Sequence, residues 1–276
     1  MTKRVFLWTA PRSVSNAFER SFRELKNSKT FHEPYCCAYY FGPQRQSTRY
    51  ENQAPDEVHN YKAIGENLLK EYDGIDLVFV KDMSYGVENH FNELLGDGMS
   101  SFQHTFLIRD PKKAVPSLHA ASVNKQLTGW DYFDPKESGF RQMYELYMFV
   151  VKHIDKCPVI VDADDLLNDP EGIMQEYCER IGARFEKEML EWEPSQVPDW
   201  DKCVGWHKNV LKSSGFQKKD PNNTQIDASR KGEEKLPNVV MQTIKNCMPF
   251  YEELHKNRIR TNTTKGHKSG IGNIDV

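Results

Sequence analysis

Short apolar stretches alternate along this chain with longer segments of helical character, and this alternation is what most constrains its fold. The stretches carry few polar residues, as strands do when both faces of a parallel sheet are covered. They span residues 3–9, 29–33, 75–81, 103–108 and 157–161. We therefore predict an α/β protein with a mostly parallel central sheet and helices on both of its faces.

The segments between the expected strands supply the helices. Predicted helices cover residues 14–26, 57–72, 86–95, 111–125, 138–154, 169–182 and 236–257. Residues 35–56 and 192–235 show no clear period and are expected to be irregular. Because no linker divides the chain, we predict a single domain over residues 1–260 and a flexible tail over residues 261–276.

Charge and composition restrict what the chain can bind. The formal net charge is −3, so a broad nucleic-acid-binding surface is not expected, and any anion must be held by a local pocket. No stretch approaches the ~20 apolar residues of a membrane helix. The six cysteines show no CxxC pair and no metal-ligand spacing. We expect a cytoplasmic protein with reduced thiols, no membrane partner and no metal, and leave its oligomeric state open.

Ligands of parallel α/β sheets bind beyond the carboxyl ends of the strands, so the residues there are candidate site residues. The first strand is followed at once by a polar segment and a helix: Pro11, Arg12, Ser13, Val14, Ser15 and Asn16. A helix N-terminus offers free amides to an anion, and the hydroxyls and the Arg12 guanidinium add donors. The segment lacks the glycines and lysine of GxxxxGK[ST]. We interpret it as an anion-binding loop, with an ordinary serine N-cap beside a surface arginine as the alternative.

A second candidate position follows the expected strand at 103–108. Arg109 would lie at the strand end, and Ser117 comes two helical turns later, where its hydroxyl can face the same pocket. A converging arginine and hydroxyl suit a second phosphate. The alternative is an Arg109 side chain paired with neighbouring Asp110, with Ser117 an ordinary helix residue.

Together the two segments resemble the phosphate-binding elements of the sulfotransferases that use 3′-phosphoadenosine 5′-phosphosulfate (PAPS). The matching patterns are strand–Thr-x-Pro-Arg-Ser-x-Ser–helix near the N-terminus and strand–Arg-Asp-Pro-(x)5-Ser in mid-chain. The resemblance implies a P-loop-like sulfotransferase architecture. It also implies sulfuryl transfer from PAPS to a hydroxyl or amine of a small-molecule acceptor, with 3′-phosphoadenosine 5′-phosphate (PAP) as product and no metal.

The same resemblance assigns roles to individual residues. It implies that residues 11–16 hold the 5′-phosphosulfate, with Arg12 at the bridging oxygen, and that Arg109 and Ser117 hold the 3′-phosphate. Three late residues look like an Arg-Lys-Gly that contacts the 3′-phosphate in cytosolic members: Arg230, Lys231 and Gly232.

The residue that accepts the proton is less clear. Cytosolic members often carry Lys-x-His after the next strand, whereas this chain has Lys81, Asp82 and Met83. Other branches, including carbohydrate sulfotransferases, place a glutamate after the second strand, where Glu33 stands. Glu33 is therefore the preferred base, with His32 and Asp82 in reserve. Burial among aromatic residues would raise the pKa of Glu33 toward neutrality, and the alternative is a carboxylate paired with a lysine or arginine.

Two other functions stay open, and so does the identity of the acceptor. A P-loop kinase would use Asp82 to hold Mg²⁺ with ATP, and a non-catalytic protein would bind PAP without transfer.

Trp206 and His207, with Ser213, Ser214 and Phe216, lie in a late segment that could close over the donor. An acceptor pocket could be lined by residues 35–41, among them Tyr35, Cys36, Cys37, Tyr39, Tyr40 and Phe41. The sequence does not distinguish a phenol, an alcohol, an amine or a carbohydrate.

Overall fold

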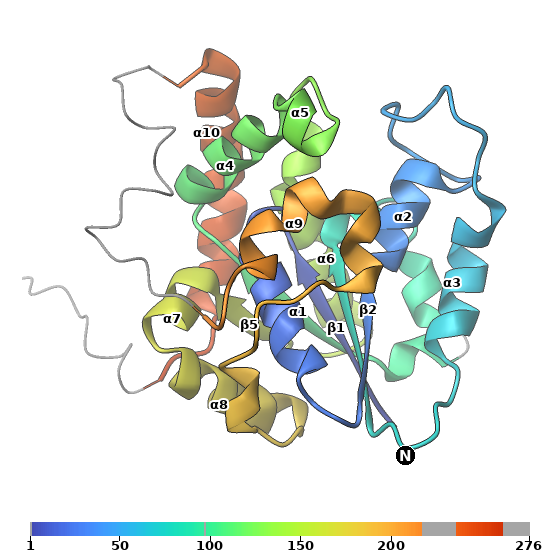
Figure 1. Cartoon of the computed structure of the whole chain (residues 1–276), viewed down its shortest axis with the longest axis vertical. Helices are drawn as coiled ribbons and strands as arrows, with labels where there is room; N and C mark the ends of the chain where they lie inside the picture. Colours follow the sequence, from blue (N-terminus) through green and yellow to red (C-terminus); the bar gives the residue numbers. More distant parts are fainter. Residues whose placement is uncertain (1, 97, 217–235, 262–276) are drawn as a thin grey trace, which may run out of the picture.

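The centre of the structure is a sheet of five parallel strands in the order β2-β3-β1-β4-β5 (Figure 1). The strands are β1 (Lys3–Thr9), β2 (Ser28–His32), β3 (Leu77–Met83), β4 (Gln103–Ile108) and β5 (Val159–Asp162). The predicted α/β class with a parallel sheet is therefore confirmed, with small shifts in the strand bounds.

The computed structural model describes residues 2–96, 98–216 and 236–261. Arg230, Lys231 and Gly232 lie outside the described residues, as does most of the predicted C-terminal tail. The predicted contact of these three residues with a phosphate therefore stays a prediction.

Helices of varied length connect and cover the strands. The α-helices are α1 (Ser15–Arg23), α2 (Pro34–Phe41), α3 (Tyr61–Leu68), α4 (Pro111–Ser122), α5 (Lys125–Thr128), α6 (Phe140–His153), α7 (Ala163–Asn168), α8 (Pro170–Ile181), α9 (Val204–Leu211) and α10 (Asn238–Lys256). The 3₁₀ helices are η1 (Glu57–His59), η2 (Ser84–Val87), η3 (Phe91–Leu95), η4 (Met99–Ser101), η5 (Pro135–Ser138), η6 (Lys187–Met189) and η7 (Pro198–Cys203). Within the described ranges, no helix is long and apolar enough to cross a lipid bilayer.

Each face of the sheet packs a separate core, because successive residues of a strand point to opposite faces. Phe6 and Trp8 of β1 join one core with α2, α3, α6 and α10. Val5 and Leu7 join the other core with α1 and α8. With both faces covered, polar side chains of the inner strands are directed to the strand ends, where a ligand site can form.

Residues 34–41 correct the expectation of an irregular segment, because they form α2. The amides of Tyr35 and Cys36 at its first turn donate to the side chain of Asp82, at 2.7 and 3.0 Å. This cap comes from β3 rather than from the preceding residues, and most sides of the helix are buried. The sequence around residues 34–41 therefore shows neither a capping residue of its own nor an amphipathic period that would have indicated a helix. Helix α9 likewise forms within the segment 192–235 that was expected to be loop-rich.

Two predicted helices are broken by single residues. Asn60 has an extended backbone, and its side chain accepts a hydrogen bond from the amide of Ala63, so it separates η1 from α3 within residues 57–72. Asn89 has a φ of +64° and divides residues 86–95 into η2 and η3. In both cases asparagine favours a turn or cap over the helix interior.

A buried histidine gives the fold a titration that can be measured. His104 of β4 is fully buried, and its Nδ1 accepts a hydrogen bond from the indole of Trp8 at 2.9 Å. Burial lowers the pKa of His104 from 6.5 to about 3, because the core solvates the charged imidazolium poorly.

We expect the free energy of unfolding to fall as the pH drops from 6.5 toward 3, because the unfolded chain binds a proton that the folded chain excludes. At about pH 4 the part due to His104 amounts to roughly 3 kcal/mol. His104→Gln keeps an acceptor for Trp8 and removes the titration. Urea unfolding should therefore show a smaller acid loss in this variant, and an equal loss in both proteins would contradict the prediction.

Candidate functional site

The loop between β1 and α1 has a backbone shape suited to an anion. Arg12 and Val14 have φ values of +66° and +67°, in the left-handed region that non-glycine residues rarely adopt. Val14 is the N-cap of α1, and it makes no side-chain capping hydrogen bond. Left-handed residues in such a turn gather N–H groups on one side, next to the positive end of the helix. Pro11 and Ser15, which flank this turn, are both buried.

Several buried polar atoms in this region have no partner among the described residues. They are Oγ of Ser13, Oδ1 of Asn16 and Nε of Arg109. Buried polar groups are almost always hydrogen-bonded, so such a cluster marks a position where a ligand would bind. The hydroxyl of Ser13 and the guanidinium of Arg109 can donate to the oxygen atoms of a phosphate or sulfate, whereas Oδ1 of Asn16 can only accept a hydrogen bond.

Arg12, Arg109 and Ser117 come together although they lie far apart in the sequence. Nη1 of Arg109 donates to the backbone oxygen of Arg12 at 2.5 Å, and Nε of Arg12 donates to Oγ of Ser117 at 3.0 Å. Within the described ranges, no carboxylate forms an ion pair with either arginine. Burial and the neighbouring Arg109 lower the pKa of Arg12. The carboxylates of Asp164, Asp162 and Asp110 act on Arg109 without pairing with it directly. Two close cations that lack a direct ion pair can bind a multiply charged anion.

The alternative pairing of Arg109 with Asp110 is not formed. The side chain of Asp110 instead accepts a hydrogen bond from the amide of Lys112 at 2.8 Å and so caps α4. Ser117 on the same helix faces Arg12. The predicted convergence of the two strand ends is therefore present in the structure.

Helix α9 covers the loop between β1 and α1. Nη1 of Arg12 donates to the backbone oxygen of Trp206 at 3.5 Å, and Nδ2 of Asn16 lies 2.6 Å from Nδ1 of His207. His207 is buried and stacks on Trp200, with ring centroids 4.9 Å apart. The structure thus places Trp206 and His207 beside the loop.

Other residues of this late segment lie elsewhere. Ser213 accepts a hydrogen bond from the indole of Trp192 at 3.1 Å. Phe216 packs edge-on against the same indole, with ring centroids 5.4 Å apart. These contacts fix the end of the segment, and they do not bring Ser213 or Phe216 to the loop between β1 and α1.

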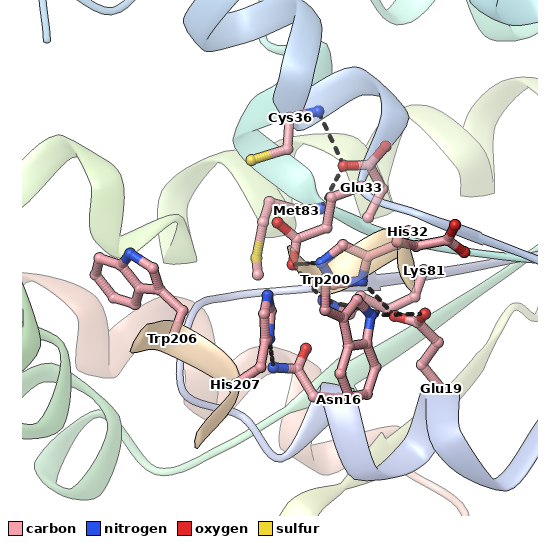
Figure 2. Close-up of polar contacts among 12 residues, drawn as sticks. Asn16, Glu19, His32, Glu33, Cys36, Lys81, Met83, Trp200, Trp206 and His207 are labelled. Atoms are coloured by element: carbon pink, nitrogen blue, oxygen red, sulfur yellow. Dashed lines mark hydrogen bonds and ion pairs between the residues drawn. The ribbon is translucent and has the colours of Figure 1, made fainter. Parts of the chain in front are cut away.

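A second polar cluster lies at the ends of β2 and β3 and centres on Glu33 (Figure 2). Lys81 is fully buried, and its Nζ is paired with Oε1 of Glu33. Burial alone would raise the pKa of Glu33, but Lys81, His32 and His207 lower it to about 2. The expected rise toward neutrality is therefore wrong, because the carboxylate is next to a buried ammonium group rather than among aromatic rings alone.

Glu19 belongs to this cluster, although it is not among the residues that the sequence predicts for the site. It is fully buried on α1, and its carboxylate accepts from Nδ1 of His32 at 2.6 Å and from the indole of Trp200 at 3.2 Å. Arg23, one turn further on, donates to the same carboxylate at 2.7 and 2.9 Å. The signal was a charged residue directly after Phe18, on the buried face of the helix. Buried carboxylates are rare unless they are paired.

The remaining candidate base, Asp82, has a structural task. It is fully buried and accepts hydrogen bonds from the amides of Tyr35, Cys36 and Met83 at 2.7, 3.0 and 2.8 Å. Burial raises the pKa of Asp82 to about 8 in spite of these three bonds. Both carboxylate oxygens are therefore engaged in fixing α2 on β3, which disfavours a magnesium-binding role.

The aromatic residues of α2 divide between the core and the site. Tyr35 packs in the sheet core, with its ring centroid 5.6 Å from that of Tyr61. Tyr39 and Tyr40 instead form a buried cluster with Met83 and Tyr85 at the end of β3. The structure thus places three of the predicted pocket residues, Cys36 among them, in one cluster with Met83, whereas Tyr35 lies in the sheet core.

Comparison with known families identifies the fold. A family model described as a sulfotransferase domain matches residues 3–258. The sulfotransferase domain from the curacin biosynthetic pathway superposes with a TM-score of 0.51 at 14% identity, covering 89% of this chain and 97% of that chain. The sulfotransferase domain of the Synechococcus PCC 7002 olefin synthase gives 0.50 at 16% identity, covering 89% and 95%. At these identities the superpositions show a shared fold.

Curated relatives are longer proteins. Branched-chain-amino-acid aminotransferase-like protein 2 of Arabidopsis thaliana is 25% identical over 277 residues, which cover 94% of this chain and 43% of that protein. Sulfotransferase ppzF of Metarhizium majus is 28% identical over 131 residues, covering 43% of this chain and 34% of that protein. The chain thus matches less than half the length of each of these relatives.

The paired arginines predict that a small polyanion stabilises the folded chain. Inorganic pyrophosphate at about ten times its Kd should raise the free energy of unfolding by ~1.4 kcal/mol, or a few degrees in Tm. A double variant, Arg12→Ala with Arg109→Ala, should show no such rise in differential scanning fluorimetry. The exposed Arg184→Ala serves as the matched control and should respond like the parent. An equal response of the double variant would contradict this assignment of the site.

Proposed function

The chain belongs to the sulfotransferase domain family, and on that premise we propose that it moves a sulfuryl group from PAPS to a small-molecule hydroxyl or amine. The single observation that carries the choice of donor is the meeting of Arg12 and Arg109 at the ends of β1 and β4, with neither arginine in an ion pair within the described residues. A donor with phosphates at both the 5′ and 3′ positions supplies charge to both arginines. The cytoplasm stays the proposed compartment.

The proposed reaction is an in-line displacement at sulfur. A lone pair of the acceptor oxygen or nitrogen forms the new bond to sulfur. The bond from sulfur to the bridging oxygen breaks, and its electron pair stays on the 5′-phosphate of PAP. Arg12 and the amides at the start of α1 face the place where this negative charge grows. Fixed donors at such a position typically lower the barrier by about 3–4 kcal/mol each.

Glu33 is proposed to orient the acceptor. Its carboxylate is ionised near neutral pH, because Lys81 and His32 hold its pKa at about 2. An ionised carboxylate accepts a hydrogen bond from the acceptor hydroxyl and fixes the attacking lone pair toward sulfur. With so low a pKa, however, it retains a proton poorly.

A cavity beside this cluster supports a small acceptor. It measures about 370 Å³, lies between α2, α3 and η1, and is lined by His32, Cys37, Ala63 and Leu68 among others. Its volume falls in the range of small-molecule sites, roughly 300–1,000 Å³. An extended polyanionic polysaccharide would need a long basic groove instead.

Two substitutions test transfer against binding alone. With labelled PAPS, EDTA and a panel of one phenol, one alcohol, one amine and one monosaccharide, we expect the parent to transfer label to one of them. Arg12→Ala should lose PAP affinity and at least about 100-fold in kcat/KM. Glu33→Gln should keep PAP affinity and lose turnover, and Arg184→Ala is again the control.

Two outcomes would contradict the proposed function. If the parent binds PAP tightly but labels none of these acceptors, a non-catalytic PAP-binding protein becomes the better description. If turnover requires ATP and Mg²⁺, the protein is a kinase.

Filling the cavity tests the position of the acceptor. Ala63→Trp occupies space on the half-buried side of α3, so KM for the acceptor should rise at least tenfold while the Kd for PAP changes less than twofold. Glu66→Trp places the same side chain on the exposed side of this helix and serves as the control. Initial-rate kinetics and calorimetry measure the two constants. An unchanged KM in Ala63→Trp would place the acceptor elsewhere.

A further inference from the structure

The contact between Glu19 and His32 fixes which nitrogen of the imidazole carries a proton. Oε2 of Glu19 lies 2.6 Å from Nδ1 of His32. The carboxylate is ionised, since His32, Lys81 and Arg23 hold its pKa at about 2 against the effect of burial. An ionised carboxylate only accepts hydrogen bonds, so Nδ1 of His32 must be the donor. In the neutral ring, Nε2 then carries a lone pair.

The second ring nitrogen, Nε2, is the one closer to Glu33. Nε2 of His32 lies 3.6 Å from Oε1 of Glu33, and His32 also lines the cavity between α2 and α3. Two aromatic rings hold the imidazole in place. Trp200 lies 5.5 Å away between ring centroids, and His207 meets the ring edge-on at 4.9 Å.

We propose that His32 takes the proton of the acceptor at Nε2 and that Glu19 is the positioning residue that holds the ring and its tautomer for this step. The inference rests on the proposed function and adds to it the residue that retains the proton. As the acceptor oxygen bonds to sulfur, its O–H bond breaks and the proton moves to Nε2. The electron pair of the broken S–O bond stays on PAP, and the imidazolium later releases its proton to solvent.

The charges around His32 allow this transfer. Glu19 on α1 and Glu33 after β2 are its anionic neighbours, and Lys81 on β3 is paired with Glu33 and lies 4.0 Å from Glu19. Arg23 is engaged with Glu19. His207 on α9 stays neutral near pH 7, because burial and the neighbouring His32 lower its pKa to about 3. The ring of His32 thus has the carboxylates of Glu19 and Glu33 as its charged contacts within the described residues.

The tautomer provides a test that needs no turnover. In water, neutral histidine mostly carries its proton on Nε2, so a proton on Nδ1 of His32 is diagnostic of the Glu19 contact. Nitrogen-15 NMR of the imidazoles, assigned with His32→Gln, should show this tautomer in the parent. Glu19→Gln should lose it, because an amide can also donate to Nδ1. A parent ring protonated on Nε2 would overturn the proposal.

Kinetics test the role in transfer. Glu19→Gln should lower kcat 10- to 100-fold, leave the Kd for PAP within twofold, and move the acidic limb of the pH–rate profile to lower pH, because the imidazolium loses an anionic neighbour. Glu19→Asp should restore part of kcat. Arg184→Ala changes an exposed residue that belongs to neither polar cluster, so it serves as the control and should keep both kcat and the pH profile.

Failure of this inference can be told apart from failure of the proposed function. An unmoved acidic limb in Glu19→Gln, with label still transferred, would overturn the role of Glu19 alone. An absence of label transfer in the parent would overturn the function, and the tautomer measured on the same sample would still decide whether Glu19 holds His32.

Discussion

The parallel register of the inner strands is the constraint on which the site depends. Thr9 at the end of β1 lies beside Met83 of β3 and Leu107 of β4, and His32 at the end of β2 lies beside Lys81. Four strand ends are thus level at one edge of the sheet. The polar residues that follow each strand meet there without long-range loops, and a shift of one strand by one residue would turn its side chains to the opposite face.

Buried charge in the second cluster is balanced rather than avoided. Glu19 and Glu33 are the two anions, and Lys81 and Arg23 are the two cations that contact them. Desolvating four charges is costly, so each must keep its partners, and loss of one partner would leave an uncompensated charge.

The strand ends were predictable because they depend on short-range patterns. Arg12, Arg109 and Ser117 follow buried strands at recognisable spacing, and hydrogen bonds join the three residues in the structure. The sequence could not predict which side chains from distant parts of the chain would contact the site residues. Asp82 caps a helix formed by residues more than forty positions earlier, and the pKa of Glu33 depends on an ammonium group from another strand.

The left-handed backbone at Arg12, Val14 and Glu33 has a consequence for how a ligand would be received. In many nucleotide-binding loops the residues with positive φ are glycines, and such loops are flexible in the absence of ligand. A residue with a side chain has fewer backbone conformations available in the unfolded chain than glycine has. In the folded chain, the surrounding structure already holds these residues in their strained conformation before any ligand binds. The loop between β1 and α1 is therefore preorganised, so its backbone would lose little conformational entropy when a ligand binds.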